Sequence, residues 1–553
     1  MSFNNKVVIV TGSSSGIGAA AAIAFAKEGA NVVIVGRNEE KMKNVSKKCE
    51  SFGKKPLVIK ADVSNDVDAK RMIDETINKF AKLDILINNA GIAEQDEITS
   101  DSFMISFDRV MNINLRAAVY ITHLAAPHLI KTKGNIINIS SIAGSTNAGS
   151  TALTAYCTSK AALNHFSRGV ALKLSGHGVR VNIISPGPVR TDILDNLSIP
   201  NFNWDTFKET TPLKRYSEPE EIADLILFLA SDRARGITGS EFIFGELYAW
   251  YTQFNTNSVD NNKMALVTNV RARPSTLALG RVIFIGSVVT QLPNRLDHGG
   301  VKMSFDNKVV IITGSSSGIG ASTAIALAKE GAHVVIVGRN EKKMKKVNEK
   351  CESYGKKPLV VKADVSKDEE AKKVIDETIK TFGKLDVLIN NAGVADWNDI
   401  TSDDFMKKFD AIMNINLRAA VYLTHLAIPH LIKTKGNIIN TSSIAGSSTL
   451  GMSLLSSYCT SKAALNHFSR GVALKLAEYG VRVNVISPGP VRTDIAESMG
   501  ADIMTWDTAA QTTALKRVSE PEEIADLMLF LASDKAIGIT GSVFISDNGS
   551  LVK

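Results

Sequence analysis

A long internal repeat constrains this chain more than any other feature of its sequence. The segment Thr11–Gly18 recurs as Thr313–Gly320, and the five residues that begin at Tyr156 recur at Tyr458, in both cases 302 positions later. The two copies align without a gap from the first apolar segment to about Phe244. A period of this length indicates a duplicated domain and not a solenoid of short repeats.

The length of the chain agrees with two domains, because 553 residues exceed what one ordinary core holds. We predict a first domain over residues 1–244, an irregular linker over 245–302 and a second domain over 303–553. The linker shows no sustained helical or strand period, and the first repeat lacks the tail Ser546–Lys553 that ends the second. These features suggest that two neighbouring genes were joined, either in nature or in gene prediction.

Short β-branched segments alternate with amphipathic helical segments inside each repeat. The predicted strands of the first repeat are Val7–Val10, Val32–Val35, Leu57–Lys60, Ile85–Ile87, Asn135–Ile139 and Arg180–Ile184. The predicted helices include Ala19–Glu28, Glu39–Phe52, Val67–Phe80, Asp101–Lys131 and Ala155–Ser175. This alternation predicts the α/β class, with two doubly wound Rossmann-type domains, mainly parallel sheets and helices on both faces. Such sheets bind ligands at the carboxyl ends of their strands.

Composition and charge argue against several classes of protein. The net charge is +8, but no nucleic-acid-binding motif accompanies the basic residues, which are spread over many helix faces. A second interpretation is that the positive charge serves to bind an anionic cofactor or substrate. The four cysteines form neither a disulfide framework nor a metal spacing, and His165 and His467 have no second ligand nearby in sequence. We therefore expect no metal, no nucleic acid and no membrane, and a cytoplasmic protein.

A glycine-rich turn follows the first predicted strand. Gly12, Gly16 and Gly18 allow a tight turn into a helix whose free N–H groups favour a diphosphate. Arg37, and Arg339 in the second repeat, follow the second strand, where NAD sites carry an acidic residue. Because an arginine there accommodates a 2′-phosphate, the sequence predicts NADP as the cofactor, with NAD as the alternative.

Tyr156 and Lys160 lie four residues apart, which places them on one face of a helix. An ammonium group beside a phenol is expected to lower the pKa of the phenol and make it a useful proton donor near neutral pH. A single pair with this spacing is more often a packed ring and a solvated charge. The surrounding motifs decide between these interpretations.

Taken in order, these motifs resemble those of the short-chain dehydrogenase/reductase family. They are Thr-Gly-x-x-x-Gly-x-Gly, Asn-Asn-Ala-Gly, a Ser-Ser turn, Tyr-x-x-x-Lys and Pro-Gly-x-x-x-Thr, spread over about 250 residues in each repeat. The resemblance covers both repeats and leaves out the linker. It implies an NAD(P)-dependent oxidoreductase that interconverts a ketone or aldehyde and an alcohol by hydride transfer, with tyrosine as the proton donor.

The resemblance also implies roles for individual residues. Tyr156 would protonate the substrate oxygen, Ser141 would hold it, and Asn114 would position a water near Lys160, which would also hold the nicotinamide ribose. The counterparts are Asn416, Ser443, Tyr458 and Lys462; Ser140 and Ser442 are the less well matched serines. The implied cofactor-binding residues of the first repeat are Thr11, Gly12, Ser14, Ser15, Gly16, Ile17, Gly18, Arg37, Asp62, Val63, Asn88, Ala90, Gly91, Tyr156, Lys160, Pro186, Gly187, Val189 and Thr191. Those of the second are Thr313, Gly314, Ser316, Ser317, Gly318, Ile319, Gly320, Arg339, Asp364, Val365, Asn390, Ala392, Gly393, Tyr458, Lys462, Pro488, Gly489, Val491 and Thr493.

Two other functions stay open at this point. One is a 3-oxoacyl-thioester reductase, and the other is a cofactor-binding protein in which the first repeat is structural only. The partly apolar segment 192–212, where the family has a mobile lid, suits a lipid-like or alicyclic carbonyl substrate, but its apolar residues could equally be packing residues. Members of the family pair through the long helices that match 101–131 and 155–175, so we expect an internal pseudo-dimer or a homo-oligomer.

Overall fold

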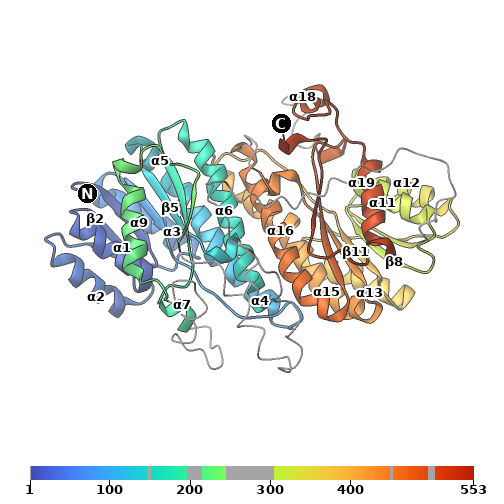
Figure 1. The fold of residues 1–553 in the computed structure, drawn as a ribbon, viewed down its shortest axis with the longest axis horizontal. Coiled ribbons are helices and arrows are strands. Elements are labelled where there is room, and N and C mark those ends of the chain that lie inside the picture. Colours follow the sequence, from blue (N-terminus) through green and yellow to red (C-terminus); the bar gives the residue numbers. More distant parts are fainter. Residues whose placement is uncertain are drawn as a thin grey trace, which may run out of the picture.

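The computed structural model describes residues 2–145, 151–195, 215–244, 304–448, 453–495 and 505–552. We call the part up to residue 244 the first half and the part from residue 304 the second half. The predicted linker 245–302 lies outside the described residues, as does most of the segment 192–212 that we expected to border the substrate. Each half contains one seven-stranded parallel sheet with helices on both faces (Figure 1).

The strands of both sheets follow the same order, β3-β2-β1-β4-β5-β6-β7 in the first half and β10-β9-β8-β11-β12-β13-β14 in the second. The first sheet consists of β1 (Val7–Thr11), β2 (Asn31–Gly36), β3 (Leu57–Lys60), β4 (Ile85–Asn88), β5 (Asn135–Ile139), β6 (Arg180–Pro186) and β7 (Glu241–Phe244). The second consists of β8 (Val309–Thr313), β9 (His333–Gly338), β10 (Leu359–Lys362), β11 (Val387–Asn390), β12 (Asn437–Thr441), β13 (Arg482–Pro488) and β14 (Val543–Ser546). The predicted fold and the six predicted strands are confirmed; the short, partly exposed β7 was not predicted.

The helices fill the connections between these strands. In the first half they are α1 (Gly16–Lys27), α2 (Glu39–Glu50), α3 (Asp66–Phe80), α4 (Phe103–Met111), α5 (Ala117–Thr132), α6 (Thr154–Ser175), α7 (Asp192–Asp195) and α9 (Pro219–Ala230). In the second they are α11 (Gly318–Lys329), α12 (Glu341–Glu352), α13 (Asp368–Phe382), α14 (Phe405–Met413), α15 (Ala419–Thr434), α16 (Ser456–Leu476), α18 (Trp506–Gln511) and α19 (Pro521–Ala532).

The predicted single helix over 101–131 is wrong in one respect. A π-helical turn, Asn112–Arg116, separates α4 from α5, and the same turn recurs as Asn414–Arg418 in the second half. A π turn inserts an extra residue into a helix and is common at functional sites. Here it carries Asn114, one of the predicted catalytic residues.

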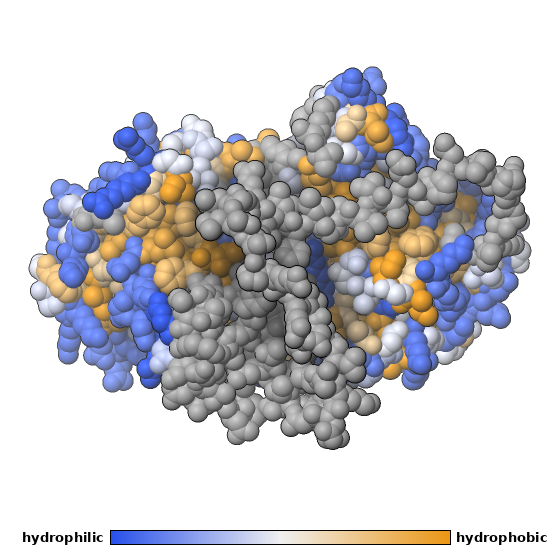
Figure 2. Space-filling view, viewed as in Figure 1, coloured by the Kyte–Doolittle hydropathy of each residue, from blue (hydrophilic) through white to orange (hydrophobic). Residues whose placement is uncertain are grey.

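A buried core lies on each face of the first sheet. β1 is buried along its whole length, so its side chains pack on both faces of the sheet. Helices α1 and α9 cover one face and pack against each other, while α3 and α5 cover the other. Figure 2 shows apolar residues at the surface over α1 and α9, and also over the corresponding helices α11 and α19. These helices therefore leave part of their apolar surface uncovered in the described residues.

The two halves pack against each other through an apolar core that contains residues of both. Helices α6 and α16 lie side by side at the centre of the molecule (Figure 1). Arg116 of the first half donates two hydrogen bonds of 2.8 and 2.9 Å to Asp410, and Arg418 of the second half donates two of 2.8 Å to Asp108. The long helices through which we expected pairing are thus in contact within one chain.

None of the described helices combines the length and the apolar character needed to cross a lipid bilayer. In the same residues, no cluster of three or more His, Cys, Asp and Glu side chains has the arrangement of a metal site.

Candidate active site

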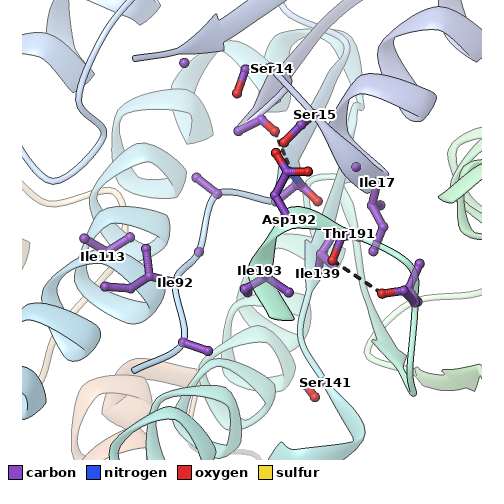
Figure 3. Close-up of a pocket in the computed structure, with 18 of the residues that line it drawn as sticks. Ser14, Ser15, Ile17, Ile92, Ile113, Ile139, Ser141, Thr191, Asp192 and Ile193 are labelled. Atoms are coloured by element: carbon purple, nitrogen blue, oxygen red, sulfur yellow. Dashed lines mark hydrogen bonds between the residues drawn. The ribbon is translucent and has the colours of Figure 1, made fainter. Parts of the chain in front are cut away.

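A cavity of about 630 Å³ opens at the carboxyl ends of the first sheet. Its lining includes residues that end or directly follow six neighbouring strands, β1 to β6: Gly12, Gly36, Ala61, Asn89, Ile139 and Pro186. Figure 3 shows Ser14 and Ser15 of the glycine-rich turn at one end of this cavity and Ser141 toward the other. The cavity therefore connects the predicted diphosphate site with the predicted catalytic residues.

The glycine-rich turn has a shape that side chains would prevent. Gly12 and Gly16 have φ angles of +64° and +54°, in the left-handed region that other residues rarely adopt. A Cβ atom on Gly18 would lie 2.4 Å from the carbonyl oxygen of Gly12, so the start of α1 can approach the turn only because residue 18 is glycine. The side-chain amide of Asn89 holds the turn by donating to the carbonyls of Thr11 and Gly12 at 3.0 and 3.2 Å.

The hydroxyl of Ser141, and not that of Ser140, faces Tyr156. Ser141 forms a side-chain hydrogen bond with Tyr156 and accepts a 3.2 Å hydrogen bond from the amide of Ala143. The hydroxyl of Ser140 instead donates to the carbonyl of Lys160 at 3.2 Å, and Ser140 is buried. This geometry supports the choice of Ser141 as the serine that meets the substrate.

Lys160 is buried close to the ring of Tyr156. Its ammonium nitrogen lies 5.7 Å from the centre of the tyrosine ring and donates to the carbonyl of Ile139 at 3.0 Å. Burial lowers the pKa of Lys160 to about 8, because a charged amine is costly away from water. The lysine is still mostly protonated at neutral pH.

The expected lowering of the phenol pKa is wrong for this structure. Burial raises the pKa of Tyr156 to about 12, and the hydrogen bond from Ser141 offsets this only in part. Desolvation is the largest cause of this shift, and the sequence shows the spacing of Tyr156 and Lys160 but not how far water is excluded from them. Tyr156 is therefore protonated at neutral pH, as a proton donor must be.

The π turn places Asn114 behind the cavity. Its side-chain oxygen accepts from the amide of Ile92 at 2.8 Å, and its side-chain nitrogen donates to the carbonyl of Ile92 and the hydroxyl of Ser159. Ser159 in turn donates to the carbonyl of Tyr156 at 2.7 Å. Asn114 thus ties the strand-end loop to the helix that carries Tyr156.

Charged groups stand at the rim of the cavity near the end of β2. Arg37 is two-thirds exposed and lies 3.8 Å from Asp62. Lys41, in the first turn of α2, forms a 2.6 Å ion pair with Asp192. Asp192 also hydrogen-bonds Ser15, and Figure 3 shows its side chain directed toward the glycine-rich turn. Two cations therefore flank the place where the sequence predicts a 2′-phosphate.

Most predicted residues of the first half line the cavity: Gly12, Ser14, Ser15, Gly16, Ile17, Arg37, Asp62, Val63, Ala90, Gly91, Ser141, Tyr156, Lys160, Pro186, Gly187, Val189 and Thr191. Thr11, Gly18, Asn88 and Asn114 do not line it. Of these, Thr11 accepts from the amide of Ala90, and Asn88 joins β4 to its neighbours by donating to Thr122 and Asn138.

Sequence reasoning missed Lys41 and Asn89 as residues of the site. Two features of the sequence could have indicated these residues. Asparagine occurs at both position 88 and position 89, and a second basic residue, Lys41, lies four residues after Arg37.

The second half repeats these contacts. Ser443 hydrogen-bonds Tyr458, and Lys462 donates to the carbonyl of Thr441 at 2.8 Å. The last strand of each sheet supports the turn that begins with Pro-Gly. The backbone amide of Gly187 donates to the carbonyl of Phe244 at 2.7 Å, and the amide of Gly489 donates to the carbonyl of Ser546 at 2.9 Å. The first half therefore keeps this support without the tail that it lacks.

The two halves differ at Glu241 on β7, where the second half has Val543. The Glu241 carboxylate accepts hydrogen bonds from Ser145, Asn164 and Ser185 and forms a 2.6 Å ion pair with Arg168, and its side chain is about 10% exposed. It joins the loop after Ser141 to α6 and β6. In the second half, the hydroxyl of Ser487 has no hydrogen-bond partner among the described residues.

We expect Glu241→Val to destabilise the first half by about 2 kcal/mol, because it leaves the side-chain donors of Ser145, Asn164 and Ser185 without their shared acceptor. Thermal unfolding followed by circular dichroism would measure the loss. Ile243→Thr, at an exposed position of the same strand, is the matched control and should have a much smaller effect. Equal midpoints for Glu241→Val and the parent chain would show that the network contributes no stability.

Comparisons with known proteins agree with this site. A family model described as enoyl-(acyl carrier protein) reductase matches residues 12–244 and again 314–550. An uncharacterized short-chain type dehydrogenase/reductase of Sinorhizobium fredii is 28% identical over 549 residues, which cover 98% of this chain and 92% of that protein. This relative aligns with both halves and with the segment between them, so a tandem arrangement occurs in a second protein.

Single-domain relatives match one half of this chain. A meso-2,3-butanediol dehydrogenase of Serratia marcescens is 36% identical over 241 residues, 43% of this chain and 93% of that protein. A 3-oxoacyl-acyl-carrier-protein reductase of Thermotoga maritima is 33% identical over 256 residues, 45% of this chain and all of that protein. These relatives are thus about as long as one half of this chain.

Proposed function

The chain belongs to the short-chain dehydrogenase/reductase family and is an oxidoreductase of that family, and from this premise we propose that each half reduces a ketone or aldehyde with NADPH. The observation that carries the proposal is the connection, through one cavity, of a diphosphate-shaped turn with Ser141, Tyr156 and Lys160. The reverse reaction, oxidation of an alcohol, uses the same residues.

The residues present fit a nicotinamide dinucleotide. The turn at Gly12 and Gly16 has no side chains that would block a diphosphate, and the N-terminus of α1 offers free N–H groups to it. Asp62 and Val63 would border the adenine, and Val189 and Thr191 would border the nicotinamide. This cofactor supplies the hydride for carbonyl reduction.

The proton that the product oxygen gains comes from a side chain of the protein. The Tyr156 hydroxyl donates its proton to the substrate oxygen as negative charge develops there, and the Ser141 hydroxyl donates a hydrogen bond to the same oxygen. The Lys160 ammonium, 5.7 Å from the ring centre, stabilises the phenolate that remains. One hydride on carbon and one proton on oxygen convert the carbonyl into an alcohol.

NADP is the preferred cofactor in this proposal because of charge at the rim. Arg37 takes the place of the acidic residue that binds a ribose 2′-hydroxyl in NAD sites, and Lys41 is a second cation nearby. Arg339 and Lys343 repeat the arrangement in the second half.

We expect the double variant Arg37→Asp, Arg339→Asp to lower kcat/KM for NADPH by about 10- to 100-fold, because each site loses a charged hydrogen bond to the 2′-phosphate. The kcat/KM for NADH should fall less than that for NADPH, or rise. Steady-state rates with both cofactors measure the ratio, and Arg235→Asp, at an exposed arginine outside the cavity, is the control. A parent chain that prefers NADH would refute the NADP assignment.

A second candidate is reduction of the 3-oxo group of a 3-oxoacyl thioester. It is favoured by the relative from Thermotoga maritima, which matches over its whole length, and by the description of the family model. A panel that contains cyclic and aliphatic ketones, a 3-oxoacyl-CoA and an enoyl-CoA separates the two candidates. If the thioesters react and the simple ketones do not, the second candidate replaces the first.

A further inference from the structure

The loop between β4 and α4 forms part of the wall of the active-site cavity. We call residues 92–102 the first rim loop, and its first three residues line the cavity: Ile92, Ala93 and Glu94. The side chain of Asn114 fixes the start of this loop through two hydrogen bonds of 2.8 Å with the backbone of Ile92. The start of the first rim loop is therefore held by its own half.

The middle of the first rim loop is attached to the segment that leads into the catalytic helix. The amide of Asp96 donates to the carbonyl of Ala152 at 2.9 Å. The next residue, Leu153, lines the cavity and directly precedes α6, the helix that carries Tyr156. The first rim loop thus borders the end of the cavity where the carbonyl of the substrate would meet Tyr156.

The far end of the first rim loop is held by the second half. The ring nitrogen Nδ1 of His425, on α15, lies 2.8 Å from the carbonyl oxygen of Ile98 and is the donor, because a carbonyl oxygen only accepts. The same ring stacks on Phe103, the first residue of α4, with 6.3 Å between the ring centres. Lys475, on α16, forms a 2.8 Å ion pair with Glu97, and its side chain is about 14% exposed.

The reciprocal contacts hold the second rim loop, residues 394–404. His123, on α5 of the first half, donates to the carbonyl of Ile400 at 2.6 Å. Lys173, on α6, forms a 2.5 Å ion pair with Asp399. The amide of Asn398 donates to the carbonyl of Leu454 at 2.7 Å, which attaches this loop to the start of α16. The same arrangement thus occurs twice, with the halves exchanged.

The contacts at the rim loops are separate from those that join the halves. The pairs of Arg116 with Asp410 and of Arg418 with Asp108 lie outside both rim loops, as does the packing of α6 on α16. Ile98 is only 1% exposed, so its carbonyl has little access to water if the histidine is removed. Loss of this donor therefore costs a hydrogen bond that water does not easily replace.

We propose that His425 and Lys475 are positioning residues for the first active site, and His123 and Lys173 for the second, so that each rim loop is held in place by the opposite half. The proposal rests on the proposed carbonyl reduction. A rim loop that loses its far support no longer keeps its cavity-lining residues in one position. The glycine-rich turn is held separately by Asn89, so binding of the carbonyl substrate should weaken and binding of NADPH should not.

The test uses the full chain with one site silenced at a time. In the Tyr458→Phe background the first site reports, and in the Tyr156→Phe background the second site reports. His425→Leu removes the donor to the first rim loop, and His425→Asn restores a donor near the position of Nδ1. His430→Leu, on the same helix, is the matched control.

We expect His425→Leu to raise KM for the carbonyl substrate about tenfold at the first site, a size that corresponds to one lost hydrogen bond. KM for NADPH, and KM for the carbonyl at the second site, should change by less than about twofold, which is below the effect of one hydrogen bond. His425→Asn should recover part of the loss. His123→Leu should show the opposite preference between the two sites.

The ion pairs give a second, milder test. Lys475→Met should raise KM for the carbonyl at the first site about threefold, since a partly exposed ion pair contributes less than a buried hydrogen bond. Lys475→Arg should keep most of the affinity, and Lys173→Met should act on the second site. Thermal unfolding checks that each variant is folded, and Lys475→Met carries the test if His425→Leu does not fold.

A rise of KM of equal size at both sites would overturn the proposal, because a general defect in packing between the halves would reach both. An unchanged KM at the first site in both His425→Leu and Lys475→Met would overturn it as well. Absence of carbonyl reduction in both silenced backgrounds, before any rim-loop contact is changed, would instead refute the proposed function.

Discussion

Replacing Tyr156 and Tyr458 together by phenylalanine is expected to lower carbonyl reduction by roughly 10²- to 10⁴-fold, because it removes the group that protonates the substrate oxygen. Each tyrosine lies in the same arrangement, hydrogen-bonded to its serine and close to its lysine. Cofactor binding should persist, since the glycine-rich turn and the rim cations are untouched. Initial rates of NADPH oxidation and a fluorescence titration with NADPH measure the two properties separately.

The single variants show how the activity is divided. Tyr156→Phe should leave the activity of the second half, and Tyr458→Phe that of the first. Tyr354→Phe is a matched control, because this exposed tyrosine corresponds to Phe52 in the first half. If Tyr156→Phe left the total rate unchanged with every substrate tested, the first half would be structural only.

Replacing Lys160 by methionine is expected to remove the activity of the first site and, at neutral pH, to stabilise the protein. The buried ammonium has a pKa of about 8 against an ordinary 10.5, a difference that corresponds to about 3 kcal/mol. Methionine loses the hydrogen bond to Ile139, which offsets about 1 kcal/mol of the gain. The net stabilisation near pH 7 is therefore about 2 kcal/mol.

The sign of the pH dependence follows from proton binding. Between the folded pKa of about 8 and the unfolded value of 10.5, the unfolded chain holds a proton that the folded chain has released, so the stability of the parent rises with pH. Below pH 8 the destabilisation by Lys160 is fully present. The advantage of Lys160→Met should thus be constant below about pH 8 and disappear as the pH approaches 10.

Thermal midpoints of parent and variant near pH 7 and near pH 10 test this prediction. Burial also raises the pKa of Cys157 and of Tyr156, but both residues are present in both proteins, so their effect cancels in the difference. Lys131→Met, at an exposed lysine of α5, is the control and should give no gain. A variant less stable than its parent at neutral pH would contradict the assignment of a costly buried charge.

Much of the fold could be read from local sequence. Continuous apolar segments such as Val7–Val10 can satisfy their backbone and bury their side chains only as inner strands of a covered sheet. The glycines at positions 12 and 16 occupy left-handed conformations, and their spacing showed where the chain turns. Because the same motifs recur 302 positions later, the same predictions apply to the second half.

Other features depend on groups that meet only after folding. The π turn at Asn112–Arg116 lies within a sequence that has an ordinary helical period, and the ion pair of Glu241 with Arg168 joins residues 73 positions apart. The ion pair of Lys41 with Asp192 spans 151 positions. No local sequence pattern predicts these contacts, because each of them forms only when two distant segments of the chain lie side by side.

The sequence by itself determined the duplicated α/β fold, the glycine-rich turn and the Ser, Tyr and Lys residues of each candidate site, because backbone conformation and burial period are encoded locally. The tertiary structure decided what surrounds those residues. It shields the half-buried Tyr156 from water enough to raise its pKa where spacing alone predicted a lower one, and it packs α16 of one half against α6 of the other. Desolvation and contacts between distant segments are properties of the packed molecule and not of any one stretch of chain.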